Sequence, residues 1–251
     1  MTRAARPEFL AALAVALLAG CATGSDGSQD RSFGLTDDER AREELLRADP
    51  SKVIAAELAF ARAAQEDGQW TAFIDYADDD AVMFVPQLVN AHAWLRQQTN
   101  PAQAVRWQPH QVWSSCDGSL AVTKGAWQRP NGTVGYFTTV WERKRDNEYE
   151  WVLDQGDTLD QALAAPELIE SKVAECARPD APGDRRERFR FVSATIRPGV
   201  CEGGTCRGGG TSADGTLSYT YEVNGQGRQL IARMRESGAM LEVLRSEVSA
   251  D

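Results

Sequence analysis

Histidine is scarce in this chain, and the little there is does not suggest a metal site. The 251 residues include two histidines, His92 and His110, and no metal-binding motif surrounds either of them. The spacing of the five cysteines matches neither a zinc finger nor a zinc ribbon. A zinc site is therefore the weaker interpretation of the cysteines, and we expect no metal and no cofactor.

Basic residues are also in short supply. The chain has 27 Lys and Arg against 37 Asp and Glu, a formal net charge of −10. Nucleic acids and anionic membrane surfaces favour clusters of Lys and Arg. This balance argues against nucleic acid as a partner, and the simplest role of the negative charge is solubility.

Two stretches lack the residues that would make them ligand sites. Gly203 to Gly210 is rich in glycine, but neither a helix nor Lys-Ser/Thr follows it, so we expect a surface loop and no phosphate site. Asp78-Asp79-Asp80 lacks the alternating spacing and the closing Glu of a calcium loop, so we expect these acids to end a helix without binding a metal. We find no internal repeat in the sequence.

The N-terminus has the organisation of an export signal. Arg3 and Arg6 precede an apolar run, Phe9 to Leu18, that is too short to span a bilayer. The run ends in Leu18-Ala19-Gly20-Cys21, which resembles the bacterial lipoprotein signal. The resemblance implies cleavage of residues 1–20, acyl chains on Cys21 and membrane anchoring without a transmembrane helix.

The residue after this cysteine is Ala22, which resembles the class of lipoproteins sorted to the outer membrane. We therefore expect a lipid-anchored protein of the bacterial cell envelope that faces the periplasm. A plain secretory signal is the alternative. Residues 21–48 are expected to form a Gly, Ser and Asp-rich tether followed by a short helix.

An exported compartment permits disulfides, and the four cysteines other than Cys21 allow three pairings. Cys201 and Cys206 are close enough in sequence to close a small loop, which would leave Cys116 with Cys176. We favour disulfides over zinc because of the compartment.

Short helices and one strand are expected between residues 49 and 98. Asp49-Pro50 starts the first helix and Gly68 lies past its end. Glu57 shares the apolar face of this helix, and we interpret it as structural rather than catalytic. The elements expected next are a helix from Trp70 to Ala77, a strand from Ala81 to Val85 and a helix from Asn90 to Gln98.

Residues 107–156 read as four consecutive strands joined by three tight turns. Asp117-Gly118 and Asn131-Gly132 are strong hairpin signals, because both central residues of a type I′ turn need positive φ, and Asp146-Asn147 is a weaker one. If all three turns have two residues, the register follows. One face then carries Trp113, Val122, Trp141 and Val152, next to a polar row of Gln111, Lys124, Thr139 and Asp154, next to Pro109, Ala126, Phe137 and Gly156.

This order of elements resembles the cone-shaped α+β fold of the nuclear transport factor 2-like superfamily, which includes SnoaL-like proteins and ketosteroid isomerase. The resemblance is greatest to its domain-of-unknown-function branch rather than to a named enzyme. The resemblance covers about residues 50–160. It is carried by Glu57, Phe60, Gly68, Tyr76, Asp80-Ala81-Val82, Pro86, Gly125, Trp127, Trp151-Val152-Leu153-Asp154 and Gly156. It implies a curved antiparallel sheet covered by helices, with the functional site in the concave space.

The resemblance also implies residue roles. It puts Asp154 forward as a general base, with Lys124 or Gln111 stabilising an oxyanion, although a nearby Lys would lower the pKa of the carboxyl. The pocket predicted from the register comprises Gln111, Trp113, Lys124, Phe137, Thr139, Trp141 and Asp154. Members of the superfamily often form homodimers through the outer face of the sheet.

Residues 166–251 are expected to form a separate module after a domain spanning residues 49–165. Pro166 to Ala177 resembles a helix, and a second β-meander follows in which one face is buried. The expected strands are Arg188 to Ile196, Thr216 to Val223, Arg228 to Arg235 and Met240 to Val248. The outer face of the first sheet is expected to be covered either by a second copy of the chain or by this meander.

Three interpretations of the polar row follow. A structural Lys124–Asp154 ion pair is the simplest, because buried charges must be paired. A lipid-anchored envelope protein that binds an apolar ligand or a partner is the function we expect first. The alternative is an isomerase, dehydratase or hydrolase that acts on a small apolar substrate with Asp154 as base.

Overall fold

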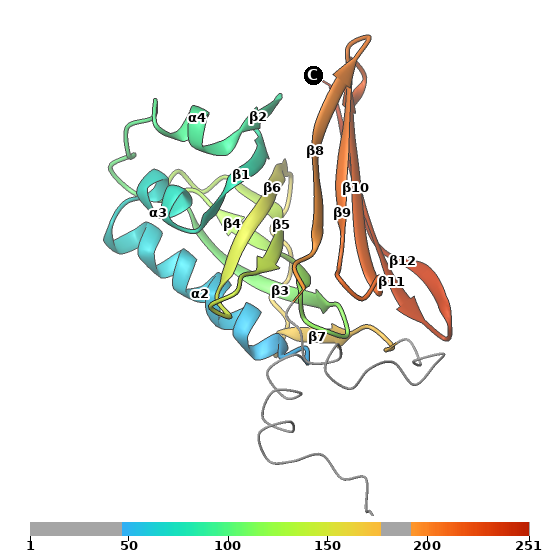
Figure 1. Cartoon of the computed structure of the whole chain (residues 1–251). Helices are drawn as coiled ribbons and strands as arrows, with labels where there is room; N and C mark the ends of the chain where they lie inside the picture. The colour runs from blue at the N-terminus through green and yellow to red at the C-terminus, as the bar shows by residue number, and fades with distance from the viewer. Residues whose placement is uncertain (1–46, 177–191, 251) are drawn as a thin grey trace, which may run out of the picture. The chain divides into compact units, whose positions relative to one another are not determined.

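The computed structural model describes residues 47–176 and 192–250. The first of these segments holds three helices and seven strands, and the second holds five strands (Figure 1). The helices are α2 (Pro50–Glu66), α3 (Gln69–Asp75) and α4 (Ala91–Leu95). The strands are β1 (Ala77–Phe84), β2 (Leu88–Asn90), β3 (Arg106–Ser114), β4 (Leu120–Gln128), β5 (Val134–Arg143), β6 (Tyr149–Leu159), β7 (Glu170–Val173), β8 (Thr195–Glu202), β9 (Thr205–Thr211), β10 (Leu217–Asn224), β11 (Gly227–Glu236) and β12 (Ala239–Ser249).

Helix α2 begins and ends where its sequence predicts. The Asp49 side chain accepts a hydrogen bond from the Ser51 N–H, and proline occupies the first helical position. The chain leaves the helix just before Gly68, whose φ of +107° suits glycine alone. The buried residues of α2 recur at helical spacing and include one acid: Val53, Glu57, Phe60 and Ala64.

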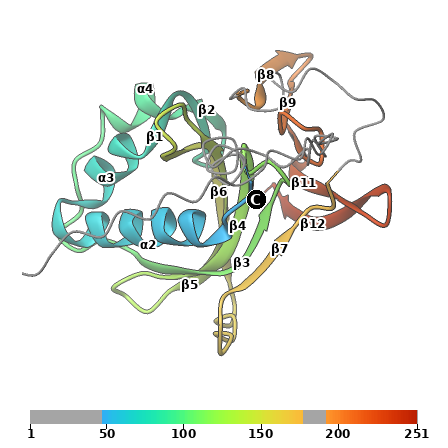
Figure 2. The same ribbon diagram turned by 60° about the horizontal axis from the view of Figure 1, so that its bottom comes forward.

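Strands β1–β7 form one open sheet in the order β2-β1-β6-β5-β4-β3-β7. Pairings β1–β6 and β3–β7 are parallel and the others are antiparallel. The three helices pack on one face of this sheet, with α2 lying along β3 (Figure 2). An α+β fold with a meander of β3 to β6 is therefore confirmed.

The opposite face of this sheet is covered by the C-terminal strands. Strands β8–β12 form a second sheet in the order β12-β11-β10-β9-β8. One buried cluster combines Leu120, Val122 and Val140 of the first sheet with Leu217 and Leu230 of the second. The C-terminal meander is thus the cover of the outer face, and homodimerisation stays an untested prediction.

The first hairpin has the predicted register near its turn. Trp113 lies opposite Val122, and Gln111 lies opposite Lys124. A bulge between Pro109 and Gln111 then shifts the pairing by one residue, so that Pro109 lies opposite Gly125 rather than Ala126.

The second hairpin is shifted by one residue from the prediction. Val122 lies opposite Val140 instead of Trp141, and Lys124 lies opposite Thr138 instead of Thr139. The loop has three residues, because the Arg129 N–H bonds to the Thr133 oxygen at 2.8 Å. Only Gly132 in this loop has positive φ, whereas a type I′ turn needs two such residues. A one-residue shift turns side chains to the other face of a sheet.

The third hairpin also has a three-residue loop, but a bulge cancels its effect. The Lys144 N–H donates to the Glu148 oxygen at 2.8 Å. The bulge lies between Val140 and Trp141, so Trp141 lies opposite Trp151 rather than Val152. Beyond it the predicted pairs are present: Thr139 lies opposite Asp154, and Phe137 opposite Gly156.

Two segments have a different secondary structure from that predicted. The helix expected from Pro166 to Ala177 is wrong, because Glu170–Val173 forms β7. All four side chains of β7 are exposed, so its pairing with the backbone of β3, and not apolar burial, selects the strand. Asp78, Asp79 and Asp80 do not break the chain before a strand but lie inside β1.

The glycine-rich segment is also a strand rather than the expected loop. Gly208 and Gly210 lie in β9, opposite Tyr221 and Tyr219 of β10. A Cβ on Gly208 would lie within 2.3 Å of the Tyr221 hydroxyl, and one on Gly210 within 2.6 Å of the Tyr219 ring. Each tyrosine ring therefore covers the glycine opposite, which makes up for the side chain that the strand lacks.

A six-residue repeat that we did not find in the sequence is evident in the structure. Ser115–Leu120 and Ser212–Leu217 both read Ser-x-Asp-Gly-Ser/Thr-Leu. In each turn the aspartate Oδ1 accepts bonds from the serine hydroxyl at 2.7 Å and from the N–H two residues on, at 2.9 Å after Asp117 and 3.0 Å after Asp214. The expectation of no internal repeat is therefore wrong, and we call these segments the paired turns.

The paired turns contact each other almost symmetrically. The Asp117 N–H donates to Asp214 Oδ2 at 2.9 Å, and the Asp214 N–H donates to Asp117 Oδ2 at 3.1 Å. The Cys116 N–H donates to Thr216 Oγ1, and the Ala213 N–H donates to Ser119 Oγ, both at 2.9 Å. The β3–β4 hairpin of the first sheet is thus joined to the β9–β10 hairpin of the second.

Two disulfides have the pairing predicted from the sequence. Cys116 is bonded to Cys176, and Cys201 is bonded to Cys206. Within the described residues, no helix is long and apolar enough to cross a membrane. The signal segment, Cys21 and most of the helix expected before Ala48 lie outside the described residues.

Candidate functional site

The candidate site is a cavity between the helices and the concave face of the first sheet. Its volume is about 230 Å³. Helices α2 and α3 supply one side, and strands β5 and β6 supply the other. The lining residues are Phe60, Gln69, Trp70, Phe73, Met83, Val105, Trp107, Trp127, Arg129, Phe137, Thr139, Asp154, Gln155, Gly156, Asp157 and Thr158.

Aromatic rings form most of the wall. The Phe60 ring lies 4.8 Å from both the Phe73 and the Trp107 rings, edge to face in each case. Trp70 packs against Phe73 at 5.5 Å. Edge-to-face packing fixes ring orientation, so these walls are rigid and the space they enclose is preformed.

Asp154 is the acidic group at the floor of this cavity. The Thr139 hydroxyl donates to Asp154 Oδ2 at 2.8 Å, from the facing position on β5. Burial raises the pKa of Asp154 to about 6, and the Thr139 hydrogen bond offsets only part of this rise. Asp154 is therefore mostly ionised at neutral pH, yet more basic than an ordinary carboxylate.

A second acid, Glu57, lies buried behind the cavity wall. Its Oε1 accepts a hydrogen bond from Trp107 Nε1 at 2.8 Å. Its Oε2 accepts from the Thr123 hydroxyl at 2.6 Å and from Trp141 Nε1 at 3.1 Å. The pKa of Glu57 is raised to about 7, mainly by burial and to a smaller extent by Asp154, while the hydrogen bonds from the three donors oppose the rise. Glu57 thus fixes two tryptophans and places a second titrating group near Asp154.

Only some of the residues predicted to form the pocket lie at the cavity. Phe137, Thr139 and Asp154 line the cavity, and Trp141 lies on the same face, where it bonds to Glu57. Gln111, Trp113 and Lys124 do not belong to it, because the shifted hairpin places them on the opposite face.

The contacts of these three residues place them on the outer face of the sheet. The Gln111 amide donates to Glu170 of β7 at 3.2 Å, and Lys124 Nζ lies 5.8 Å from the centre of the Tyr136 ring. Trp113 packs in the core shared with the second sheet. The predicted Lys124–Asp154 ion pair is therefore absent from the described residues, which is why the pKa of Asp154 is raised rather than lowered.

Several cavity residues were not found from the sequence. The predicted register places Trp127 on the outer face, but it lines the cavity instead, because the one-residue shift of the β4–β5 hairpin turns the side chains of β4 to the other face. Trp70, Trp107 and Arg129 were not assigned to a site. The one available signal was Glu57, an acid on an apolar helix face, which was interpreted as structural alone.

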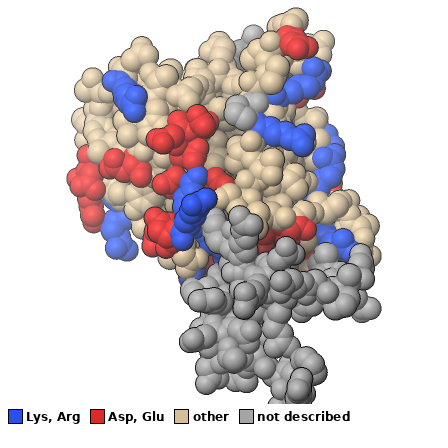
Figure 3. Space-filling view, viewed as in Figure 1, with Lys and Arg blue, Asp and Glu red and all other residues tan. Residues whose placement is uncertain are grey.

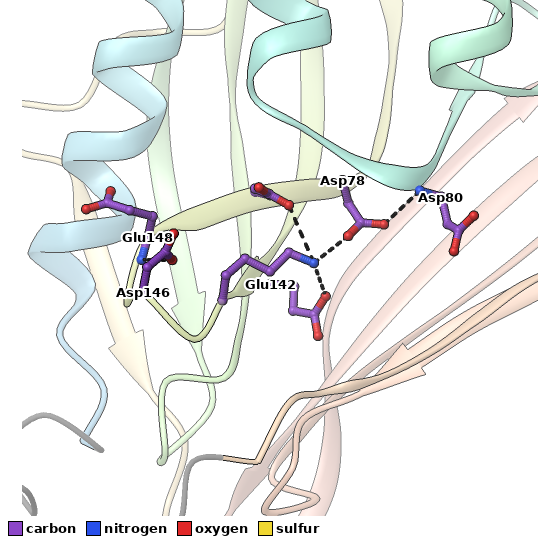
Figure 4. Close-up of polar contacts among 7 residues, drawn as sticks. Asp78, Asp80, Glu142, Asp146 and Glu148 are labelled. Atoms are coloured by element: carbon purple, nitrogen blue, oxygen red, sulfur yellow. Dashed lines mark hydrogen bonds and ion pairs between the residues drawn. The ribbon is translucent and has the colours of Figure 1, made fainter.

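Acids outside the cavity surround a lysine. Lys144 Nζ bonds to Asp78, to Glu142 at 2.8 Å and to Glu150 at 3.5 Å (Figure 4). Burial lowers the pKa of Lys144, but the bonds to Asp78 and Glu142 outweigh this effect and raise it. Asp78 thus has an ammonium partner, and no cluster of three or more metal-binding side chains exists within residues 47–176 and 192–250.

The two described segments differ in charge. Residues 47–176 carry 11 Lys and Arg against 19 Asp and Glu, a net charge of −8, whereas residues 192–250 carry six of each and are neutral. On the face shown in Figure 3, acidic side chains gather over α2, α3 and β1, and basic ones lie mainly over β8–β12. The segment with the cavity therefore accounts for most of the acidic character.

Comparison with known proteins finds likeness in solved structures only. No protein-family model matches the sequence, and no curated protein matches it. A ketosteroid isomerase candidate from Parabacteroides distasonis is 14% identical, with a TM-score of 0.36 over 46% of this chain and 97% of its own. An NTF-2-like protein of unknown function from Burkholderia xenovorans is 22% identical, with a TM-score of 0.31 over 47% of this chain and 90% of its own.

These similar structures are of ketosteroid isomerase-like and nuclear transport factor 2-like proteins, the superfamily named above from the sequence. A candidate aromatic ring hydroxylase from Novosphingobium aromaticivorans is similar at 16% identity and a TM-score of 0.36, over 46% of this chain and 92% of its own. Likeness at this level says nothing about substrate or reaction.

Proposed function

We propose that this protein binds a small, largely apolar molecule in the aromatic cavity and is anchored to the bacterial cell envelope through lipid on Cys21. The observation that supports binding is a largely aromatic cavity with the Asp154 carboxylate at its floor. Within the described residues, the Asp154 side chain is hydrogen-bonded only by Thr139. Ligand sites are commonly apolar pockets with a few polar groups that orient the ligand.

The cavity volume limits the ligand. An apolar cavity of about 150 Å³ accommodates benzene. The 230 Å³ found in this protein therefore suits a substituted single ring or a compact bicyclic molecule.

A release experiment tests the binding proposal. Val105 lines the cavity, so Val105→Trp should fill it, whereas Val200→Trp is a matched control at a site where the side chain is 64% exposed. We expect mass spectrometry to detect a small apolar molecule released from the natively purified wild type and Val200→Trp, but not from Val105→Trp. Equal release from both variants would contradict the proposal.

The anchor rests on the sequence of residues 1–22 and is supported by the two disulfides, which are typical of exported proteins. Labelling cells with an alkyne fatty acid tests it. Wild type should incorporate label and partition with membranes, and Cys21→Ser should do neither. Label on the Cys21→Ser variant would disprove the assignment.

A catalytic role is the second candidate, and the raised pKa of Asp154 favours it. A general base works best when its pKa is near the working pH. Lys124 and Gln111 lie on the other face, so neither can stabilise an oxyanion beside Asp154. Binding is therefore the first proposal. Turnover that disappears in Asp154→Asn while ligand still binds would make catalysis the better description.

A further inference from the structure

Asp154 lacks a counter-ion. Among residues 47–176 and 192–250, no Lys or Arg forms an ion pair with it. The other charged residues that line the cavity are Arg129 and Asp157, and Glu57 lies behind the wall. The Arg129 guanidinium lies 5.1 Å from the centre of the Trp127 ring. The cavity therefore combines two carboxylates with one guanidinium that stacks on a ring.

The walls are suited to a positive charge. Six lining residues are aromatic: Phe60, Trp70, Phe73, Trp107, Trp127 and Phe137. The face of an aromatic ring carries negative electrostatic potential, and Trp attracts cations most strongly. An ammonium group in such a cavity would be held by ring faces and by the Asp154 carboxylate, which has no cationic partner among the described residues.

The charge of the surrounding chain acts in the same direction. Residues 47–176 have a net charge of −8, and the cavity lies entirely within them. A surplus of one sign raises the local concentration of oppositely charged ligands. A negatively charged ligand would meet repulsion both from this field and from Asp154.

From these three observations we infer that the ligand is a small organic ammonium ion with an apolar body, whose positive charge pairs with Asp154. The inference rests on the proposed function, because it names the chemical class of the ligand for the same cavity. A neutral ligand that donates a hydroxyl hydrogen bond to Asp154 is the competing class. The two classes can be distinguished by comparing the affinities of a charged and a neutral ligand of the same shape.

An isosteric pair of probes tests the inference. Phenyltrimethylammonium and tert-butylbenzene have nearly the same shape, neither donates a hydrogen bond, and only the first is charged. Binding to the full-length chain can be followed by tryptophan fluorescence, since Trp70, Trp107 and Trp127 line the cavity. The variants are Asp154→Asn and, as a matched control, Asp160→Asn, which removes an exposed carboxylate outside the cavity.

We expect the cation to bind wild type at least about tenfold more tightly than the neutral isostere. Asp154→Asn should abolish most of this preference and leave the affinity for tert-butylbenzene within about twofold, while Asp160→Asn should change neither affinity.

Other outcomes overturn the inference in distinguishable ways. Equal affinities of wild type for both probes would exclude a cation site and leave the apolar cavity of the proposed function intact. An equal loss of both probes in Asp154→Asn would show that Asp154 shapes the cavity without selecting charge. Binding of neither probe would count against the proposed function as well.

Discussion

Removing the Asp154 carboxylate should stabilise the protein at alkaline pH. Burial raises the pKa of this group from 3.8 to about 6. Between these values the folded protein holds a proton that the unfolded chain has released, so the free energy of unfolding falls as pH rises. The slope is about 1.4 kcal/mol per pH unit, which over roughly two units amounts to about 3 kcal/mol lost above pH 6.

Asp154→Asn removes this penalty because an amide carries no charge, and its oxygen can still accept the Thr139 hydrogen bond. Some of the gain will be offset by imperfect amide packing, so we expect an increase of about 1–3 kcal/mol in the free energy of unfolding at pH 8. At pH 3.5 Asp154 is mostly protonated in both states, and the pH-dependent part of the difference should fall to about 0.2 kcal/mol. A residue whose removal stabilises the fold is typical of a functional site.

Urea denaturation of wild type and variant at pH 8, 6 and 3.5 measures the effect. The titration of Glu57 is present in both proteins, so its first-order contribution cancels in their difference. Asp160→Asn is the control for loss of one carboxylate. A variant no more stable than wild type at pH 8, or a difference that does not change with pH, would refute the assignment of Asp154 as a buried, unpaired acid.

Three further experiments test other parts of the structure by urea denaturation. Glu57→Ala should cost about 3–5 kcal/mol, because it leaves three donors unpaired in a buried cavity; a cost under about 1 kcal/mol would contradict its role. Asp117→Ala and Asp214→Ala should show a coupling of about 1–3 kcal/mol in a double-mutant cycle, and additive effects would mean that the paired turns act independently. Replacing Cys116 and Cys176 by Ser opens a loop with a sequence separation of 60 residues and should cost about 4 kcal/mol, whereas an unchanged midpoint would exclude a stabilising disulfide.

Helix starts and hairpin positions could be predicted because each depends on a few neighbouring residues. The disulfide pairs could be predicted because Cys201 and Cys206 are close in sequence, which leaves Cys116 with Cys176. Asp49-Pro50 specifies a helix start, and Asp117-Gly118 specifies a turn. The register between hairpins could not be predicted in the same way. Asn131-Gly132 is compatible with a two-residue or a three-residue loop, and the choice depends on φ at Asn131, which the dipeptide alone does not determine.

The candidate site was affected by this uncertainty because it depends on which face each strand presents. The shift at Asn131-Gly132 moved Lys124 to the outer face, whereas Thr139 and Asp154 stayed together because a longer loop and a bulge cancel. Glu57 was visible as an acid on an apolar helix face. Its three donors come from β3, β4 and β5, and contacts over such sequence separations cannot be read from local patterns.

The paired turns join the two sheets through two hexapeptides of similar sequence that make equivalent hydrogen bonds to each other. Each hexapeptide both donates to and accepts from the other through matching groups, a reciprocity usually found where identical subunits meet. Such reciprocity admits one relative orientation of the hairpins. Grafted onto two unrelated hairpins, the same twelve residues should act as a portable connector for β-sheet modules, which makes the junction a building part in its own right.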